Sequence, residues 1–368
     1  MKTVANILTR KELSKHDVVR LLSISNPDDQ HRLIKKAYFV KETIVGKKVY
    51  LRGLIEFSNQ CRKNCLYCGI RKDNSNVTRY SMSDDEILQL VEYALRNQLT
   101  DIVLQSGELD NERFTRRITS LIRAIKKVAG TDFRITLSLG EQSKDTYQEW
   151  FDAGAQRYLL RIETSNEALY KKIHPHDEVH QFRVRLKCLE TIQKTGYQTG
   201  TGVMIGLPCQ TIDNLADDLL FIKHMDIDMV GMGPYLEHVD TPLSLYKEAL
   251  MPLVDRYNLS LRMIAVLRLL MPYINIASTT ALQSIFPMGR EQGLKAGANV
   301  IMPNLTPVDY RKKYLLYENK SCLDEDDDPC LECLRKRIGL IGEELMFNNH
   351  GDSRHFTQRR QVTNNIYI

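Results

Sequence analysis

Three cysteines, Cys61, Cys65 and Cys68, lie within eight residues of one another. Thiolates at this spacing suit one side of a four-iron, four-sulfur cluster, and three of them leave its fourth iron without a protein ligand. An iron with an open position indicates a role in catalysis. A structural zinc site is the alternative, but it needs a fourth protein ligand. No His or Cys occurs between residues 69 and 173, so that ligand would have to be remote.

A second group of cysteines, Cys322, Cys330 and Cys333, lies near the end of the sequence. Its thiolates also suit an iron–sulfur cluster, with zinc binding or free thiols as alternatives. Clustered cysteines in a long chain indicate metal binding rather than a disulfide framework. Cys188 and Cys209 stand alone, and we expect both to be small buried side chains.

Polar residues follow one of the apolar runs of the sequence. Gln105, Ser106, Gly107 and Glu108 come directly after residues 101–104. The small residues among them allow a ligand to approach the backbone closely. A simple turn after a strand is the alternative interpretation.

Charged residues interrupt a second apolar run, at residues 157–163. Arg157, Arg161 and Glu163 lie inside it. Such charges are costly when they are buried without a partner, so they indicate either a charged ligand or ion pairs.

The segment that follows carries three histidines and an arginine, at His174, His176, His180 and Arg185. The histidines could form a metal site, but we expect a loop with solvated histidines instead. Without a ligand, Arg185 would be a solvated charge on a helix.

Apolar, β-branched runs that predict strands recur through the middle of the chain. They cover residues 51–57, 101–105, 133–139, 157–163, 200–206, 229–233, 274–278 and 300–302. Amphipathic stretches separate them, and Ser83 and Thr211 stand where helix caps are expected. Strands that alternate with helices form a parallel sheet. Eight such units predict an α/β fold with a complete (β/α)8 TIM-type barrel, and an open doubly wound sheet is the alternative.

Three parts of the chain follow from this pattern. We expect residues 1–46 to form an N-terminal helical extension and residues 47–310 to form the barrel. Residues 311–368 would be a C-terminal segment with the second cysteine group and a polar tail. In TIM-type barrels the functional residues lie at the carboxyl ends of the strands. The first cysteine group, which directly follows the first strand, is therefore expected at the barrel mouth.

Composition excludes several classes of protein. The 368 residues are 43% hydrophobic and 26% charged, which is typical of a globular protein and excludes a fibrous or wholly disordered one. A net charge of +5 without a dense basic run argues against nucleic-acid binding. The sequence shows neither a membrane-spanning run nor the pattern of a secretory leader. We therefore expect a cytoplasmic protein that acts as a monomer.

The residues around the first cysteine group resemble a known family. A Cys-x3-Cys-x2-Cys motif with Tyr67 before the last cysteine is typical of the radical S-adenosylmethionine superfamily. The wider context, residues 55–69, resembles the [FeFe]-hydrogenase maturases of the HydE family, and the likeness extends to about residue 340. The resemblance implies that the open iron of a [4Fe–4S] cluster binds S-adenosylmethionine. Reductive cleavage would then yield methionine and a 5′-deoxyadenosyl radical.

The resemblance also implies roles for individual residues. Cys61, Cys65 and Cys68 would be the catalytic cluster ligands, and Cys322, Cys330 and Cys333 would hold an auxiliary [2Fe–2S] or [4Fe–4S] cluster. The residues implied in S-adenosylmethionine binding are Tyr67, Gln105, Ser106, Gly107, Glu108, Glu163 and Arg185. The residues implied near the substrate are Arg157, Thr279, Thr280, Met302, Tyr314 and Tyr317. The last two share a helix face if their segment is helical.

The function implied by the resemblance is assembly of the H-cluster of [FeFe]-hydrogenase. The radical would attack a cysteine-bound Fe(CO)2CN complex from the maturase HydG, and the product would pass towards HydF. An external donor would supply the electron. Methylornithine synthase and biotin synthase are related alternatives, and the second cysteine group argues against both. A non-catalytic iron–sulfur or zinc carrier is an alternative of another class, against which the charged residues at the strand ends argue.

Overall fold

The computed structural model describes residues 3–321 and 327–366, with side chains described at 3–321 and 331–361. The helices are α1 (Val4–Ile7), α2 (Lys15–Leu22), α3 (Pro27–Ile44), α4 (Asp84–Arg96), α5 (Glu112–Ala129), α6 (Lys144–Ala153), α7 (Glu167–Ile173), η1 (Glu178–His180), α8 (Phe182–Thr195), α9 (Ile212–His224), η2 (Pro242–Ala249), α10 (Leu253–Leu270), α11 (Thr280–Ile285), α12 (Gly289–Lys295), α13 (Val308–Arg311), α14 (Asp327–Leu340) and α15 (Arg354–Ile366). The strands are β1 (Lys48–Leu51), β2 (Gly53–Ser58), β3 (Asp101–Ser106), β4 (Arg134–Ser138), β5 (Arg157–Leu159), β6 (Gln198–Thr201), β7 (Met204–Ile205), β8 (Met229–Gly231), β9 (Gly233–Pro234), β10 (Asn275–Ala277), β11 (Val300–Ile301) and β12 (Glu344–Met346).

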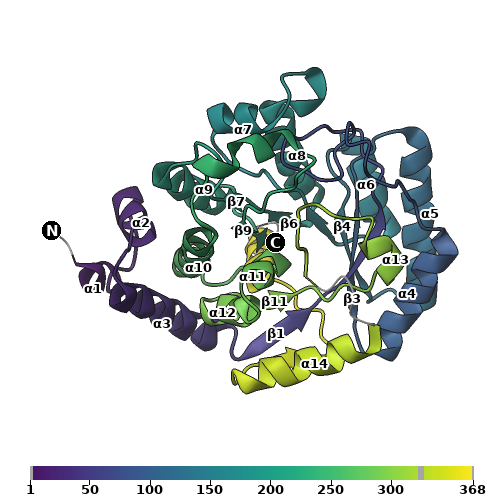
Figure 1. The fold of residues 1–368 in the computed structure, drawn as a ribbon. Helices are drawn as coiled ribbons and strands as arrows, with labels where there is room; N and C mark the ends of the chain where they lie inside the picture. The colour runs from purple at the N-terminus through teal and green to yellow at the C-terminus, as the bar shows by residue number, and fades with distance from the viewer. Residues whose placement is uncertain (1–2, 322–326, 367–368) are drawn as a thin grey trace.

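Among the described residues, ten strands form one sheet in the order β12-β1-β11-β10-β8-β6-β5-β4-β3-β2, and every pair in it is parallel. The short strands β7 and β9 pair with each other beyond the ends of β6 and β8. Helices α4, α5, α6, α8, α9, α10 and α12 surround the strands (Figure 1). The predicted α/β fold with a parallel, TIM-type sheet is confirmed. The order has β12 and β2 at its two ends, so these strand pairings form an open sheet. The predicted complete barrel is not confirmed.

Local signals in the sequence place the starts of several helices. Ser14, Ser83 and Thr211 each form a capping box, in which side chain and backbone bond reciprocally across the first turn. Helix α3 begins at Pro27 after the cap residue Asn26, because proline suits the first helical position, where no N–H partner is needed.

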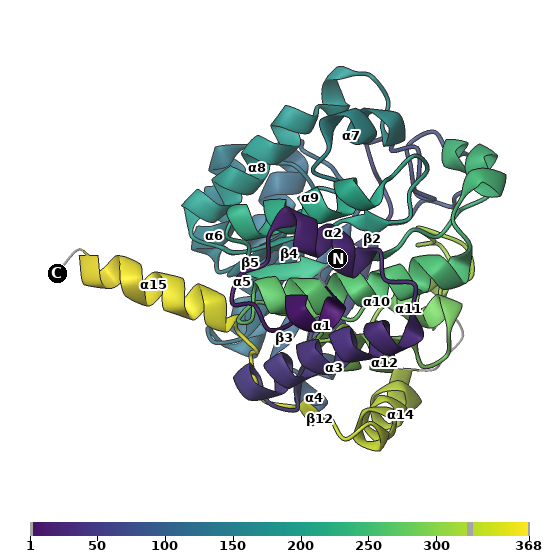
Figure 2. The same cartoon turned by 90° about the vertical axis from the view of Figure 1, so that its left-hand side faces the viewer.

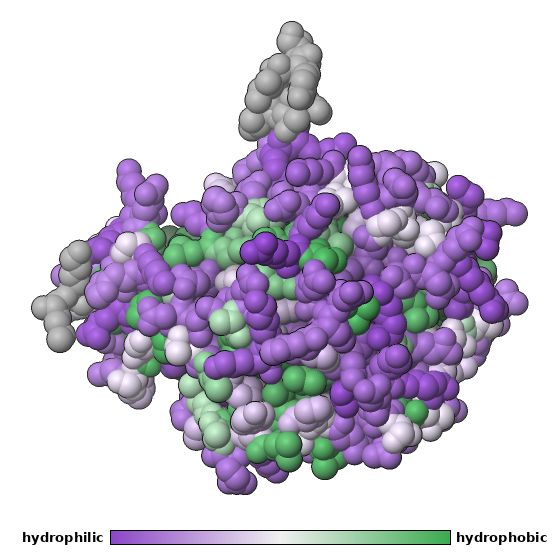
Figure 3. Space-filling view, turned by 90° about the horizontal axis from the view of Figure 1, so that it is seen from above, coloured by the Kyte–Doolittle hydropathy of each residue, from purple (hydrophilic) through white to green (hydrophobic). Residues whose placement is uncertain are grey.

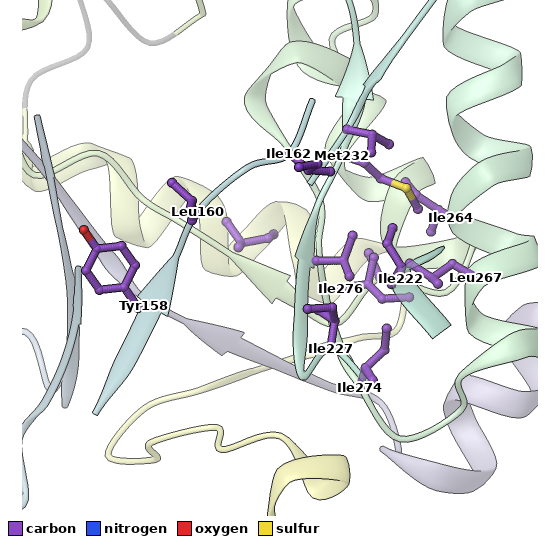
Figure 4. Packing of buried hydrophobic residues seen from close by; sticks show 14 of the residues in the cluster. Tyr158, Leu160, Ile162, Ile222, Ile227, Met232, Ile264, Leu267, Ile274 and Ile276 are labelled. Carbon is purple, nitrogen blue, oxygen red and sulfur yellow. The ribbon is translucent and has the colours of Figure 1, made fainter. Parts of the chain in front are cut away.

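The hydrophobic core lies between the sheet and the surrounding helices. In Figure 4, Ile276 of β10 lies near Ile222 of α9 and near Ile264 and Leu267 of α10, and all four side chains are fully buried. Burying a side chain of this size contributes about 1.5–3 kcal/mol. This packing fixes the strands from whose ends the polar loops begin.

Helix α10 is buried on most of its surface because the N-terminal helices cover its outer side. Both α2 and α3 pack against it (Figure 2). The guanidinium of Arg268 is buried there and donates to the carbonyls of Gly297 and Ile274. This burial explains the long apolar run that the sequence shows over α10.

The surface of the protein is mainly hydrophilic, with separate hydrophobic areas between charged side chains in the view of Figure 3. No helix in the described part of the chain combines the length and the apolar character needed to cross a membrane.

Candidate active site

Cys61, Cys65 and Cys68 lie together on the loop that follows β2. The thiols are close enough to interact electrostatically, and burial raises the pKa of each one, to about 12 for Cys65. The backbone N–H of Glu108 donates to the sulfur of Cys61 over 3.3 Å. Three thiols in one low-dielectric pocket fit a metal cluster, because bound metal replaces their protons and stabilises the thiolate form.

Two glycines let neighbouring loops approach these cysteines. A Cβ atom at Gly107 would collide with the carbonyl of Gln60 and lie 2.8 Å from the Cβ of Cys61. Gly140 has a φ of +78°, and a Cβ atom there would collide with the carboxylate of Glu108. Gly107 therefore lets the loop after β3 approach the cysteine loop, and Gly140 lets the loop after β4 approach Glu108.

Four charged residues, three of them buried and Arg185 largely buried, form a network beside the thiols. Arg185 donates to Glu108 over 3.1 Å and to Glu141 over 2.9 Å. Lys63 lies 3.1 Å from Glu108 and 2.8 Å from Glu141. Burial alone would raise the pKa of Glu141, but Arg185 and Lys63 hold it below its usual value. Two cations and two carboxylates in one pocket match a ligand that carries both an amino group and a carboxylate.

Glu163 lies at the edge of the same pocket, with a φ of +65° and an exposed fraction of 6%. Its carboxylate accepts hydrogen bonds of 3.0 and 3.1 Å from the guanidinium of Arg161. It also lies near enough to Cys68 to raise the pKa of that thiol. The sequence left open whether Glu163 binds a charged ligand or forms an ion pair. The structure contains the ion pair, with Arg161 as the partner.

The structure brings several predicted residues together around the three thiols. Arg185 lowers and Glu108 raises the pKa of Cys65, which places both close to it. Tyr67 is held on the cysteine loop, 3.4 Å from the ring of His174. The hydroxyl of Tyr314, buried with 1% exposure, accepts from Gln105 over 3.3 Å. The alternative interpretation of Arg185, a solvated charge on a helix, is wrong, because the side chain is paired with carboxylates from two other loops.

Arg157 lies elsewhere. It is the first residue of β5 and is fully buried in ion pairs with Asp101, the first residue of β3, and with Asp352. The amino ends of parallel strands lie opposite the end that carries the cysteine loop. The predicted position facing the substrate is therefore not supported for Arg157, whose charge is neutralised by two carboxylates at the floor of the sheet.

The remaining predicted substrate residues are more widely spread. Thr279 and Thr280 lie at the start of α11, and Met302 lines a cavity of about 20 Å³ inside the sheet. The segment after Arg311 is not helical, so Tyr314 and Tyr317 do not share a helix face. The substrate contacts of these residues stay predictions.

The isolated cysteines differ from each other. Cys188 is buried as predicted, with 8% exposure. The prediction for Cys209 is wrong: this residue is exposed and has a φ of +62°. It occupies a turn in which the left-handed backbone favours glycine, so its side chain points outward from the turn rather than into the core.

The second cysteine group is described only in part. Cys322 lies outside the described residues, and the side chain of Cys330 is not described either. Cys330 and Cys333 both belong to α14, and Cys333 is exposed. Residues three apart on a helix lie on the same face, as ligands of one cluster must.

Sequence reasoning missed four residues of the site. Glu141 follows a predicted strand, so the strand-end pattern that singled out Glu108 could have found it. Lys63 stands between two cysteines and has no further sequence signal. The prediction of solvated histidines is wrong for His174 and His180, which are 2% and 5% exposed. Burial lowers the pKa of His174 to about 3 and lowers that of His180, so both rings are neutral.

Comparisons with known proteins agree with this geometry. Residues 55–222 match the model of the radical SAM superfamily, the class of enzyme that the cysteine loop and the α/β fold define. The [FeFe] hydrogenase maturase subunit HydE of Thermotoga maritima is 45% identical over 92% of this chain and 93% of its own length. The chain belongs to the HydE family of radical S-adenosylmethionine enzymes, which use a [4Fe–4S] cluster and S-adenosylmethionine.

Two proteins of lower sequence identity also resemble this chain, one in sequence and one in fold. A 3-methylornithine synthase of Methanosarcina acetivorans is 27% identical over 90% of each chain. The crystal structure of the maturase HydG from Carboxydothermus hydrogenoformans superposes with a TM-score of 0.81 at 20% identity, over 96% of this chain and 81% of that one. At this low identity the HydG structure supports the fold alone.

Proposed function

We propose that this protein acts in the assembly of the H-cluster of [FeFe]-hydrogenase. The observation that carries the proposal is the 45% identity to HydE, which extends over nearly the whole length of both chains. The substrate would be a cysteine-bound Fe(CO)2CN complex from HydG, and the product would pass towards HydF. When bound, the cluster supplies the electron that cleaves S-adenosylmethionine into methionine and a 5′-deoxyadenosyl radical. An external protein donor would reduce the cluster.

The residues of the pocket would bind and orient S-adenosylmethionine. Cys61, Cys65 and Cys68 would hold the cluster. The carboxylate of Glu108 would accept from the amino group of the methionine part, and Arg185 would donate to its carboxylate. Both ions lie in the buried network with Lys63 and Glu141, which keeps them aligned before the ligand arrives. The other residues proposed to line this ligand are Tyr67, Gln105, Ser106, Gly107 and Glu163.

The substrate would lie further along the inside of the sheet. Tyr314 supports this position, because its buried hydroxyl accepts from the side chain of Gln105 over 3.3 Å. The other residues proposed near the substrate are Thr279, Thr280, Met302 and Tyr317. The deoxyadenosyl radical would then form between the cysteine loop and these side chains.

The sheet would close into a complete (β/α)8 barrel. Strands β1 and β2 are separated by Arg52 alone, and β1 pairs with β11 while β2 pairs with β3. Across the break, the N–H of Arg52 donates to Ile301 and that of Leu54 donates to Pro303. These bonds support the interpretation that β1 and β2 are two parts of one strand. That strand would connect β11 with β3 and so close the barrel.

We also propose the division of the chain into a helical extension (1–46), the barrel (47–310) and a C-terminal segment (311–368). The segment would hold the auxiliary cluster on Cys322, Cys330 and Cys333. The protein would act in the cytoplasm as a monomer.

Activation of a hydrogenase tests this function. Metal-depleted [FeFe]-hydrogenase is incubated anaerobically with HydG, HydF, S-adenosylmethionine, a reductant and this protein. We expect hydrogen evolution that depends on this protein and disappears with Cys65→Ala. Equal activation without the protein would contradict the proposal. Formation of 3-methylornithine would instead assign the chain to the methylornithine synthases.

A further inference from the structure

The cysteine loop is held from outside by the segment 173–180, which joins α7 to α8. The N–H of Leu66 donates to the carbonyl of Ile173 over 3.1 Å. The ammonium of Lys63 donates to the carbonyl of Val179. Figure 1 shows α7 at the edge of the molecule, beside the loop that follows β2. Two positions on either side of Cys65 are thus tied to one short segment.

A histidine of that segment contacts the residue directly before Cys65. The ring of His180 accepts through Nε2 from the backbone N–H of Asn64, over 2.9 Å. Its Nδ1–H donates to the carboxylate of Asp177 over 2.6 Å. A neutral imidazole has one donor and one acceptor nitrogen, so the bond to Asp177 leaves Nε2 free of a proton and able to accept.

The second buried histidine contacts the loop on the other side of Cys65. The Nδ1–H of His174 donates to the carbonyl of Tyr170 over 2.9 Å, which leaves Nε2 as the acceptor for the hydroxyl of Tyr67 at 3.4 Å. The two imidazole rings lie 5.9 Å apart and pack together under the loop. In both rings Nε2 accepts from the cysteine loop. The hydrogen bond that Nδ1–H donates to another residue fixes the tautomer.

We propose that His180 is a positioning residue for the cluster, because its acceptor nitrogen fixes the backbone conformation from which Cys65 reaches the metal. Asp177 selects the tautomer of His180, and His174 steadies the loop at Tyr67. The inference rests on the proposed use of Cys61, Cys65 and Cys68 as ligands. It extends that function to a segment from which no residue is proposed as a ligand of the cluster or of S-adenosylmethionine.

Three variants of the cluster-loaded, full-length protein test this role. His180→Phe keeps a ring of similar volume but has no acceptor nitrogen. His180→Gln supplies a carbonyl acceptor on a flexible side chain. His176→Ala is the matched control, since His176 is exposed on the same segment. Two readouts are used: hydrogen–deuterium exchange of the Asn64 amide, and the electron paramagnetic resonance spectrum of the reduced cluster with and without S-adenosylmethionine.

The expected results separate a positioning role from simple packing. The Asn64 amide should exchange about tenfold faster in His180→Phe, and the spectral change caused by S-adenosylmethionine should be diminished. His180→Gln should recover most of both properties, and His176→Ala should match the wild type. Unchanged exchange and spectra in His180→Phe would overturn the proposal, as would equal losses in the Phe and Gln variants.

The proposed ligand set can fail separately from this inference. Absence of a cluster signal from the wild-type protein would refute the ligand assignment. The exchange of Asn64, which is also measured without metal, would still decide whether His180 holds the loop. Should His180→Phe not fold, His180→Ala gives the same comparison with His180→Gln.

Discussion

At the residue scale, the carboxylate of Glu163 forms an ion pair in the structure and is also proposed to bind S-adenosylmethionine. Its carboxylate is paired with Arg161 in the structure, and it also lies near the thiol of Cys68. A sulfonium or a pair of ribose hydroxyls would bind to the same ionised oxygens. Arg161 donates in addition to the carbonyls of Gly231 and Val203, so it keeps partners when Glu163 turns to a ligand.

Glu163→Gln is therefore expected to affect binding more than folding. Loss of the charged contact should weaken S-adenosylmethionine binding about ten- to a hundredfold, at a nearly unchanged melting temperature. Equilibrium binding and thermal unfolding measure the two effects. Glu167→Gln is the control, because Glu167 forms an exposed pair with Lys171. Normal affinity together with a large fall in melting temperature would leave Glu163 as a scaffold residue.

Sequence patterns located the charged residues of the site better than the histidines. Glu108, Glu163 and Arg185 were found because a charge in or after an apolar strand needs a partner, or because a family motif contains it. The burial of His180 depends on Asn64, which lies 116 positions earlier in the chain. A pattern of neighbouring residues cannot indicate a contact between residues so far apart in the sequence. The sequence therefore predicts a loop with solvated histidines at residues 174–180.

At the element scale, α14 contains Cys330 and Cys333, two of the three cysteines that are proposed to hold an auxiliary cluster. Replacing Cys322, Cys330 and Cys333 together by Ser should lower the iron content of the protein, while cleavage of S-adenosylmethionine persists. Iron analysis and product chromatography on the same sample measure both. If cleavage disappears from a folded variant that keeps its first cluster, the second cluster is not auxiliary.

Helix α9 presents a buried carboxylate to the start of α7. Asp218 is fully buried and accepts from the N–H and the hydroxyl of Ser165, both over 2.6 Å. Burial raises its pKa from 3.8 to about 6, despite these bonds. The folded state therefore holds this proton more tightly than the unfolded state. Its contribution to stability is full below about pH 4 and is lost as the pH rises through about 6.

Asp218→Asn should remove that dependence on pH. Relative to the variant, the wild type should lose about 2 kcal/mol of unfolding free energy between pH 4 and pH 7. Denaturant titrations at several pH values give this difference, and other titrating groups cancel in it. Asp217→Asn is the control, because the side chain of Asp217 is 44% exposed. Parallel pH profiles for the wild type and Asp218→Asn would contradict the assigned pKa.

Helix caps were predictable because they depend on residues three or four positions apart. The segment that carries Tyr314 was not predictable in this way. Its carbonyl at Leu316 accepts from Gly69 of the cysteine loop, and the N–H of Glu318 donates to Glu237. Bonds to two distant loops replace the internal bonds that a helix would need.

At the scale of the whole molecule, the C-terminal segment covers the end of the sheet at which the strands β3 and β5 begin. Arg157 is bonded there to Asp101 and to Asp352, and the carbonyl of His350 accepts from the same guanidinium. Strand β12 adds to the sheet beside β1. Strand β12 has only three residues, which is too short to show a periodicity. The sequence therefore predicts neither this strand nor the contact of the C-terminal segment with Arg157.

Arg157→Leu should therefore destabilise the fold. It removes the guanidinium that Asp101 and Asp352 share, while Arg52 stays 3.4 Å from Asp101 and Arg134 stays 3.4 Å from Asp352. Because both carboxylates keep a second cation, the loss should be about 3 kcal/mol of unfolding free energy or less, with S-adenosylmethionine affinity unchanged. Denaturant unfolding measures the loss. Arg116→Leu is the control, because Arg116 forms an exposed pair with Glu112. Normal stability with loss of substrate turnover would restore Arg157 to the substrate site.

The central claim is that the loop of Cys61, Cys65 and Cys68 supports reductive cleavage of S-adenosylmethionine. The most direct test measures 5′-deoxyadenosine and methionine from the anaerobically reconstituted wild-type protein and from Cys65→Ala, both with dithionite as reductant. We predict equal amounts of the two products from the wild type and almost none from a folded Cys65→Ala variant. Undiminished 5′-deoxyadenosine formation by Cys65→Ala would contradict the account.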